Sequence, residues 1–291
     1  MVVYTLFLTA VFRLIGGRRI QAVDRYDPLS NTWQAMATPP LELHHFQAVS
    51  MEDGIYLMGA MTGKYPGETP IERVLVFRPE QNTFEYHHTI PKERRRGGAG
   101  TVAHKGKIYL VGGIVDGHRK GYQPWLDEYN PSTGEWRVLP DAPHARDHFA
   151  AVITNNILYA ISGRTTSQST KQTFELTITQ SDAFDLQNER WLPNGSTPNI
   201  PTPRAGTMAN GVAHYTVIAG GESGSQKIAH NEVEALNTLT NKWETWPSLE
   251  TGRHGTGLIY FNDALYVVAG SGNRGGSPEL NTLERMQLTP R

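Results

Sequence analysis

Four arginines recur at one position of a repeated pattern, and their side chains are suited to binding anions. Each stands sixteen residues before a strand-ending pair that contains glycine; the four are Arg96, Arg146, Arg204 and Arg253. A guanidinium is permanently charged and forks onto a carboxylate or phosphate through paired hydrogen bonds. Guanidiniums that converge on one opening repel each other unless acceptors or an anion lie between them. The recurrence of arginine at this repeat position therefore predicts a site for an acidic sugar, a carboxylate metabolite or an acidic peptide.

Other candidate residues are expected on the same rim. The strand that follows each arginine is antiparallel to the next one, so the glycine pair that ends the second strand returns to the face where the arginines stand. Histidines lie two residues after the register position in two repeats, and a histidine follows Arg253 directly. The predicted ligand-binding set is Arg96, Arg146, Arg204, Arg253, His45, His148, His254, Arg18, Arg164, Glu222 and Arg274.

The recurring arginines also have a structural interpretation. Arginine at a fixed repeat position can tie neighbouring repeats together through backbone carbonyls or through carboxylates such as Asp147 and Glu222. Some of these side chains can point inward while others point sideways. Both interpretations stay open on the sequence alone.

No metal site and no cofactor are predicted. His44-His45 and His87-His88 are adjacent pairs, and neighbouring strand residues face opposite sides of a sheet. Asp141, His144 and His148 share one turn, which is a weak grouping. The chain has no cysteine, so disulfides and thiolate metal sites are impossible. The sequence also has no nucleophile elbow, phosphate-binding glycine loop or zinc-protease motif.

Composition narrows the classes of partner. The formal net charge of -1 gives no global signal for nucleic acid or a membrane surface. The apolar opening MVVYTLFLTAVFRLIGG lacks a basic leading segment and a small-residue cleavage site, and it is too short to span a bilayer. We therefore predict that it forms core strands of a soluble protein, and no motif assigns a compartment.

The elements that must position these residues come from a repeat of about fifty residues. An apolar strand ends in a pair such as Gly112-Gly113, and the next strand has an aromatic that precedes an outer aromatic by seven residues, as in Tyr129 and Trp136. The strand-ending pairs are Gly16-Gly17, Gly59-Ala60, Gly112-Gly113, Ser162-Gly163, Gly220-Gly221 and Ala269-Gly270.

Glycine pair, spaced aromatic and outer tryptophan together resemble the Kelch repeat, over essentially the whole chain. The resemblance implies an all-β fold, a six-bladed Kelch-type β-propeller built around a central channel. One domain, 1–291, is expected, with blades at about 1–40, 41–91, 92–143, 144–201, 202–249 and 250–291. The chain stops at Arg291, before the outer aromatic expected after Met286, so the last blade should lack its outermost strand. Residues 283–288 would then form an exposed edge open to contact with another molecule.

Two functions follow from these expectations. The first is a binding module whose channel mouth takes a small anionic or sugar-like ligand or an acidic peptide. The alternative, which resembles some bacterial Kelch proteins, is a cofactor-free isomerase that interconverts anomers of an acidic sugar such as sialic acid. His148, His254 and Glu222 are then the candidate acid and base groups. Copper-radical oxidases that resemble Kelch propellers need a cysteine cross-linked to tyrosine, and this chain has none.

Overall fold

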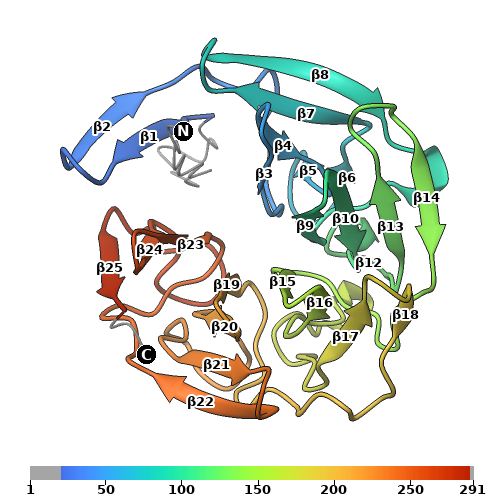
Figure 1. The fold of residues 1–291 in the computed structure, drawn as a ribbon, viewed down its shortest axis with the longest axis vertical. Coiled ribbons are helices and arrows are strands. Elements are labelled where there is room, and N and C mark those ends of the chain that lie inside the picture. The colour runs from blue at the N-terminus through green and yellow to red at the C-terminus, as the bar shows by residue number, and fades with distance from the viewer. Residues whose placement is uncertain (1–20, 289–291) are drawn as a thin grey trace.

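The computed structural model describes residues 21–288, which form antiparallel sheets arranged radially around a common axis (Figure 1). Helical structure in this range is limited to two short 3₁₀ helices, η1 (Lys92–Arg94) and η2 (Gln168–Thr170). No helix among these residues has the length and apolar character needed to cross a membrane. The all-β β-propeller expected from the repeat is confirmed.

Five of the sheets are blades, and we number them in chain order. The first blade contains β3 (Val49–Ser50), β4 (Ile55–Leu57), β7 (Arg73–Arg78) and β8 (Thr83–Thr89). The second contains β9 (Gly100–His104), β10 (Lys107–Val111), β13 (Leu126–Tyr129) and β14 (Trp136–Leu139). The third contains β15 (Val152–Thr154), β16 (Ile157–Ala160), β17 (Asp182–Asp185) and β18 (Arg190–Trp191). The fourth contains β19 (Met208–Val212), β20 (Tyr215–Ala219), β21 (Val233–Asn237) and β22 (Lys242–Trp246). The fifth contains β23 (Leu258–Phe261), β24 (Ala264–Val268) and β25 (Leu283–Gln287).

The prediction of six blades is wrong, because the described residues form five. Where a further blade was expected, β1 (Asp24–Asp27) and β2 (Thr32–Ala35) pair with each other as a two-stranded sheet between the first and fifth blades (Figure 1). The repeat identified this hairpin correctly but not its partners, since the inner strand expected at 12–15 and the pair Gly16-Gly17 lie outside the described residues. Tyr26 of the hairpin packs against Tyr266 and Val268 of the fifth blade.

The last blade has three strands within the described range, in the order β23-β24-β25. This matches the expectation that 283–288 form its outer edge. A groove of about 290 Å³ beside this edge is lined by apolar side chains that include Leu258, Leu265 and Met286.

Two small sheets rise from the connections between second and third strands. β5 (Met61–Thr62) pairs with β6 (Thr69–Pro70) in the first blade, and β11 (Ile114–Asp116) pairs with β12 (Lys120–Tyr122) in the second. We use the term rim for these connections in all five blades: residues 58–72, 112–125, 161–181, 220–232 and 269–282. These two hairpins place polar residues at the channel mouth, away from the blade cores.

The aromatics spaced by seven residues hold the outer parts of the blades together. Tyr129 and Trp136 are directly opposite on β13 and β14, with ring centroids 4.6 Å apart and the rings stacked. The indole of Trp191 donates a 2.8 Å hydrogen bond to the carbonyl of Pro140, which belongs to the preceding blade. Trp136 and Trp191 thus pack against the aromatic residues opposite them, and the indole N–H of Trp191 also links two blades.

Candidate functional site

The four register arginines lie inside the blades. Each is at most 1% exposed, and each donates hydrogen bonds to the backbone of its own blade. Arg96 Nε donates to the carbonyl of Gly112 over 2.6 Å, and Arg204 Nε donates to the carbonyl of Gly220 over 2.6 Å. The sixteen-residue spacing thus joins the start of the first strand to the end of the second.

Each of these arginines also has its own carboxylate on the third strand. The pairs are Arg96–Asp127 at 2.7 Å, Arg146–Asp182 at 2.6 Å, Arg204–Glu234 at 2.5 Å and Arg253–Glu284. Burial lowers the pKa of Arg96 to about 10, so its guanidinium still carries its charge at neutral pH. Each of the four guanidiniums therefore has a carboxylate partner within its own blade, as in the structural interpretation, and Asp127 also pairs with Arg94 at 2.9 Å.

A ring of backbone hydrogen bonds lines the channel two residues after the arginine position. Gly98 N donates to the carbonyl of His45 over 2.8 Å, and His148 N donates to the carbonyl of Gly98 over 2.7 Å. The ring continues through Gly206 and Gly255. All five residues have positive φ, from 52° at His45 to 69° at Gly255, a conformation that costs glycine little and other residues more. Two blades nevertheless have histidine there.

Those two histidines meet a third one from the rim. His118 lies between β11 and β12, and its ring centroid is 4.7 Å from that of His148 and 4.8 Å from that of His45. The centroids of His45 and His148 are 4.7 Å apart. One ring nitrogen of each histidine lies within 4.8 Å of those of the other two. We call His45, His118 and His148 the three-histidine group, and their residue types could hold a metal ion.

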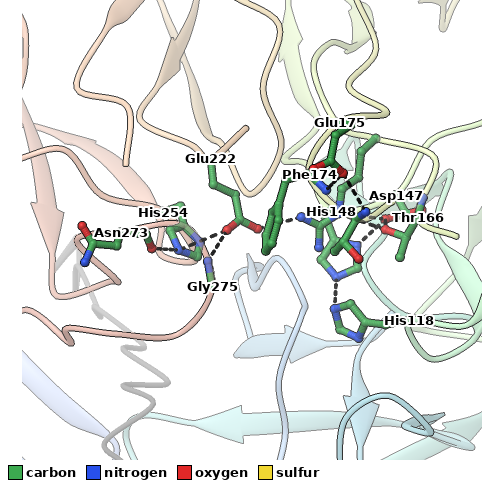
Figure 2. Close-up of polar contacts among 12 residues, drawn as sticks. His118, Asp147, His148, Thr166, Phe174, Glu175, Glu222, His254, Asn273 and Gly275 are labelled. Atoms are coloured by element: carbon green, nitrogen blue, oxygen red, sulfur yellow. Dashed lines mark hydrogen bonds and ion pairs between the residues drawn. The ribbon is translucent and has the colours of Figure 1, made fainter. Parts of the chain in front are cut away.

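Two buried carboxylates orient the rings. Glu68 Oε1 lies 3.0 Å from Nδ1 of His118, and Asp147 Oδ1 is hydrogen-bonded to Nδ1 of His148. Figure 2 shows His118 and His148 facing each other, with Asp147 and Thr166 behind His148. Burial, and then the charge of Arg164, hold the pKa of His148 well below its ordinary value. This imidazole is therefore neutral at neutral pH.

A second polar group lies on the far side of Phe174 in the same view (Figure 2). Glu222 pairs with Arg164 at 2.7 Å and with His254 at 3.4 Å, and its Oε2 accepts a 2.8 Å hydrogen bond from Gly275 N. Burial works against ionisation, but the charges of His254 and Arg164 outweigh it and lower the pKa of Glu222. Glu222 is thus an ionised carboxylate with several donors.

Phe174 lies between two guanidiniums. The Arg164 carbon Cζ is 5.5 Å from the centre of its ring, and that of Arg274 is 5.7 Å away. Arg164 is buried, whereas Arg274 is exposed and donates only to the carbonyl of Gly224 among the described side-chain contacts. Of the arginines predicted to bind ligand, Arg274 is the one that the described structure leaves open to solvent, and Arg18 lies outside the described residues.

Other basic side chains join Arg274 at the surface. All five rim connections place at least one exposed lysine or arginine there: Lys64, Arg119, Lys120, Lys171, Lys227 and Arg274. The exposed carboxylates of the same segments are Glu72 and Glu175. The rim surface is therefore predominantly basic although the whole chain is close to neutral.

His118, Glu68 and Phe174 were not predicted from the sequence as site residues. His118 and Glu68 stand 50 residues apart and meet only because the hairpins of neighbouring blades lean together. The sequence did contain one signal for the histidine group: His45 and His148 occupy a repeat position where the three other blades have glycine. His144, which had been grouped with Asp141 and His148, instead pairs with Asp182 at 2.8 Å.

Comparison with known families decides what the repeat is. The model of the KLHDC2/KLHL20/DRC7 Kelch-repeats domain matches residues 98–289. The chain belongs to the Kelch-repeat family. Kelch-repeat domains are typically protein-interaction modules, and most of the chain falls within this match.

Relatives of known sequence and structure agree with this assignment. Kelch-like protein terF from Aspergillus terreus is 24% identical over 257 residues, which is 85% of this chain and 54% of that protein. Kelch-like protein 40 from Xenopus tropicalis is 27% identical over 186 residues, or 61% of this chain and 29% of that protein. This Kelch chain thus spans about half of the first relative and under a third of the second. The solved structure of YjhT has a TM-score of 0.73 and 17% identity, covering 92% of this chain and 89% of that one, and it shows the shared fold alone.

Proposed function

We propose that this Kelch-repeat domain is a non-enzymatic interaction module whose rim binds an acidic segment of a partner protein. The observation that carries the proposal is the exposed basic side chain on every rim connection, from Lys64 in the first blade to Arg274 in the fifth. Kelch relatives generally bind protein partners, which agrees with this use of the rim. The charges of the register arginines are already balanced, so the exposed set supplies the attraction.

An extended acidic segment suits this arrangement better than a small anionic or sugar-like ligand. A small acid offers one carboxylate, whereas the exposed cations come from five separate connections. Phe174 adds an aromatic surface beside the exposed Arg274. Aromatic and arginine side chains are enriched where protein interfaces gain most of their binding energy.

The alternative function, a cofactor-free isomerase of an acidic sugar such as sialic acid, has less support. A general acid or base must reach the substrate proton, whereas His148 is buried and hydrogen-bonded to Asp147, and Glu222 is bonded to Arg164 and Gly275. An NMR assay of anomer exchange across a panel of acidic sugars separates the two functions. Accelerated exchange that is lost in Glu222→Gln would favour the isomerase.

A peptide panel tests the interaction module directly. The peptides differ only in how many glutamates replace glutamines, and binding is followed by fluorescence anisotropy at two salt concentrations. Affinity should rise with the number of glutamates and fall as salt screens the exposed charges. Equal affinity for the glutamine and glutamate peptides would contradict the proposal.

A further inference from the structure

We propose that His45, His118 and His148 form a binding site for a divalent transition-metal ion of the zinc class. This site is separate from the exposed basic rim, and nothing in the proposed interaction function requires it.

The hydrogen bonds of two rings fix which nitrogen has the lone pair. When Glu68 and Asp147 are ionised, each accepts at the Nδ1 of its histidine, and His118 and His148 both donate from Nδ1. Their Nε2 atoms then keep the lone pairs, and these two atoms lie 3.0 Å apart. Two lone pairs at that distance repel, so a positive species between them stabilises the arrangement.

His45, the third ring, also donates from Nδ1, because His44 lies between it and a backbone carbonyl. His44 Nε2 lies 3.2 Å from the carbonyl of Gly63, which can only accept, so in neutral His44 this nitrogen donates. Nδ1 of His44 is then an acceptor for Nδ1 of His45, 2.6 Å away. Nε2 of His45 retains the lone pair.

The ionisable groups packed against the three histidines include Glu68, Asp147 and Arg164. Glu68 and Asp147 are 1% and 0% exposed, and among residues 21–288 the ion pair of Glu68 is with His118 alone. Glu68 Oε2 is buried without a hydrogen-bond partner in this part of the chain. Arg164 lies 3.9 Å from Asp147 but 2.7 Å from Glu222. A buried carboxylate with an unsatisfied oxygen beside three imidazoles is a surrounding that a divalent ion would balance.

The backbone supplies an independent indication. His45 and His148 have φ of 52° and 54°, at the repeat position where Gly98, Gly206 and Gly255 occur. A left-handed conformation costs a non-glycine residue about 1–2 kcal/mol, and strain of this kind concentrates at functional sites. Histidine at both positions is therefore explained by the use of its side chain.

The donor set identifies the class of metal. Three imidazoles suit zinc, cobalt, nickel and copper, whereas magnesium and calcium prefer oxygen. Carboxylates behind two of the rings resemble the outer hydrogen bonds that orient histidine ligands in metal sites. His45 is partly exposed, which gives an ion a way in from solvent.

The test uses the full chain purified without a histidine tag and stripped with a chelator. Zn²⁺ binding is measured by isothermal titration calorimetry, and Co²⁺ is added to read the coordination geometry from its visible spectrum. We expect one ion per chain and the intense visible bands of four-coordinate cobalt. Absence of stoichiometric binding of either ion would overturn the proposal.

Three variants assign the site. His118→Gln should lower the Zn²⁺ affinity at least 100-fold and abolish the cobalt bands, and Glu68→Gln should lower the affinity about 10-fold to 100-fold by removing the orienting carboxylate. His104→Gln on β9, outside the group, is the matched control and should bind as the wild type does. Circular dichroism establishes that each variant is folded. Unchanged binding in a folded His118→Gln chain would place the ion elsewhere and overturn the assignment.

Discussion

The Nε2 atoms of His118 and His148 lie 3.0 Å apart, although the two residues belong to neighbouring blades and stand 30 positions apart in the chain. His118 reaches this position because the β11–β12 hairpin extends the second blade toward the channel, and His148 because its backbone turns sharply with positive φ. The rim of the second blade therefore meets the inner surface of the third at these two side chains. Contacts of this kind determine which side chains the channel mouth presents.

Replacing a register arginine should damage stability and leave the rim intact. Arg204→Met leaves Glu234 buried without its 2.5 Å partner and frees the carbonyl of Gly220. Breaking a buried ion pair from one side costs about 3–5 kcal/mol, so the free energy of unfolding should fall by that amount. Urea denaturation followed by fluorescence measures the change.

The double variant Arg204→Met, Glu234→Leu is the control for this prediction. Removing both charges avoids the unpaired carboxylate, so the double variant should be more stable than Arg204→Met alone. If the single and double variants lose equal stability, the pair does not act as a unit.

Substituting glycine at a histidine of the channel ring should separate metal binding from stability. His45→Gly relieves the cost of φ at 52°, which is about 1–2 kcal/mol for a non-glycine residue, although glycine loses more backbone entropy on folding. We expect the metal-free variant to unfold within about 1 kcal/mol of the wild type while its Zn²⁺ affinity falls sharply. A loss of several kcal/mol without metal would show that the His45 side chain has a structural role. Gly98→Ala, which adds a side chain at the neighbouring ring position, is the reverse control and should be destabilising.

Acid sensitivity should depend on Glu222. Its pKa in the folded chain is below the ordinary value of 4.5, so the unfolded chain takes up the proton at higher pH than the folded chain. The stability that Glu222 contributes is thus complete above that value and is lost as pH falls through the folded pKa. Urea unfolding at pH values from neutral to about 3 should show a steeper loss in the wild type than in Glu222→Gln.

The exposed Glu135, in the turn between β13 and β14, supplies the control. Glu135→Gln should keep the steep acid dependence of the wild type. An equally steep dependence in Glu222→Gln would assign the acid sensitivity to other carboxylates.

The sequence predicted those parts of the fold that repeat. The glycine pairs, the spaced aromatics and the register arginine are local requirements of each blade: a turn, a cross-strand stack and a link between adjacent strands. Tyr129 and Trp136 are opposite because a hairpin of that length places them so. The number of blades was not predictable in this way, since the β1–β2 hairpin follows the repeat pattern yet forms a separate two-stranded sheet.

The candidate site was predicted only in part because its residues meet through packing between blades. Sequence spacing gave His45, His148, His254 and Glu222 a common rim, but not the separation of His254 from His148 by Phe174. The sixteen-residue spacing alone could not distinguish an arginine whose side chain points into the channel from one that is hydrogen-bonded within its own blade. Arg146 is the clear case, since Asp182 becomes its partner only when β17 forms.

The most direct test of the interaction function compares two triple variants that each remove three positive charges, from different parts of the surface. Lys64, Lys227 and Arg274 are exposed on the rim, whereas Lys105, Arg190 and Lys242 are exposed near the turns at the opposite ends of the strands. Each set is changed to glutamine, and binding of a glutamate-rich peptide is measured by anisotropy. The account predicts that the rim triple loses about 10-fold or more in affinity while the other triple binds as the wild type does. Equal affinity of the two triple variants would contradict it.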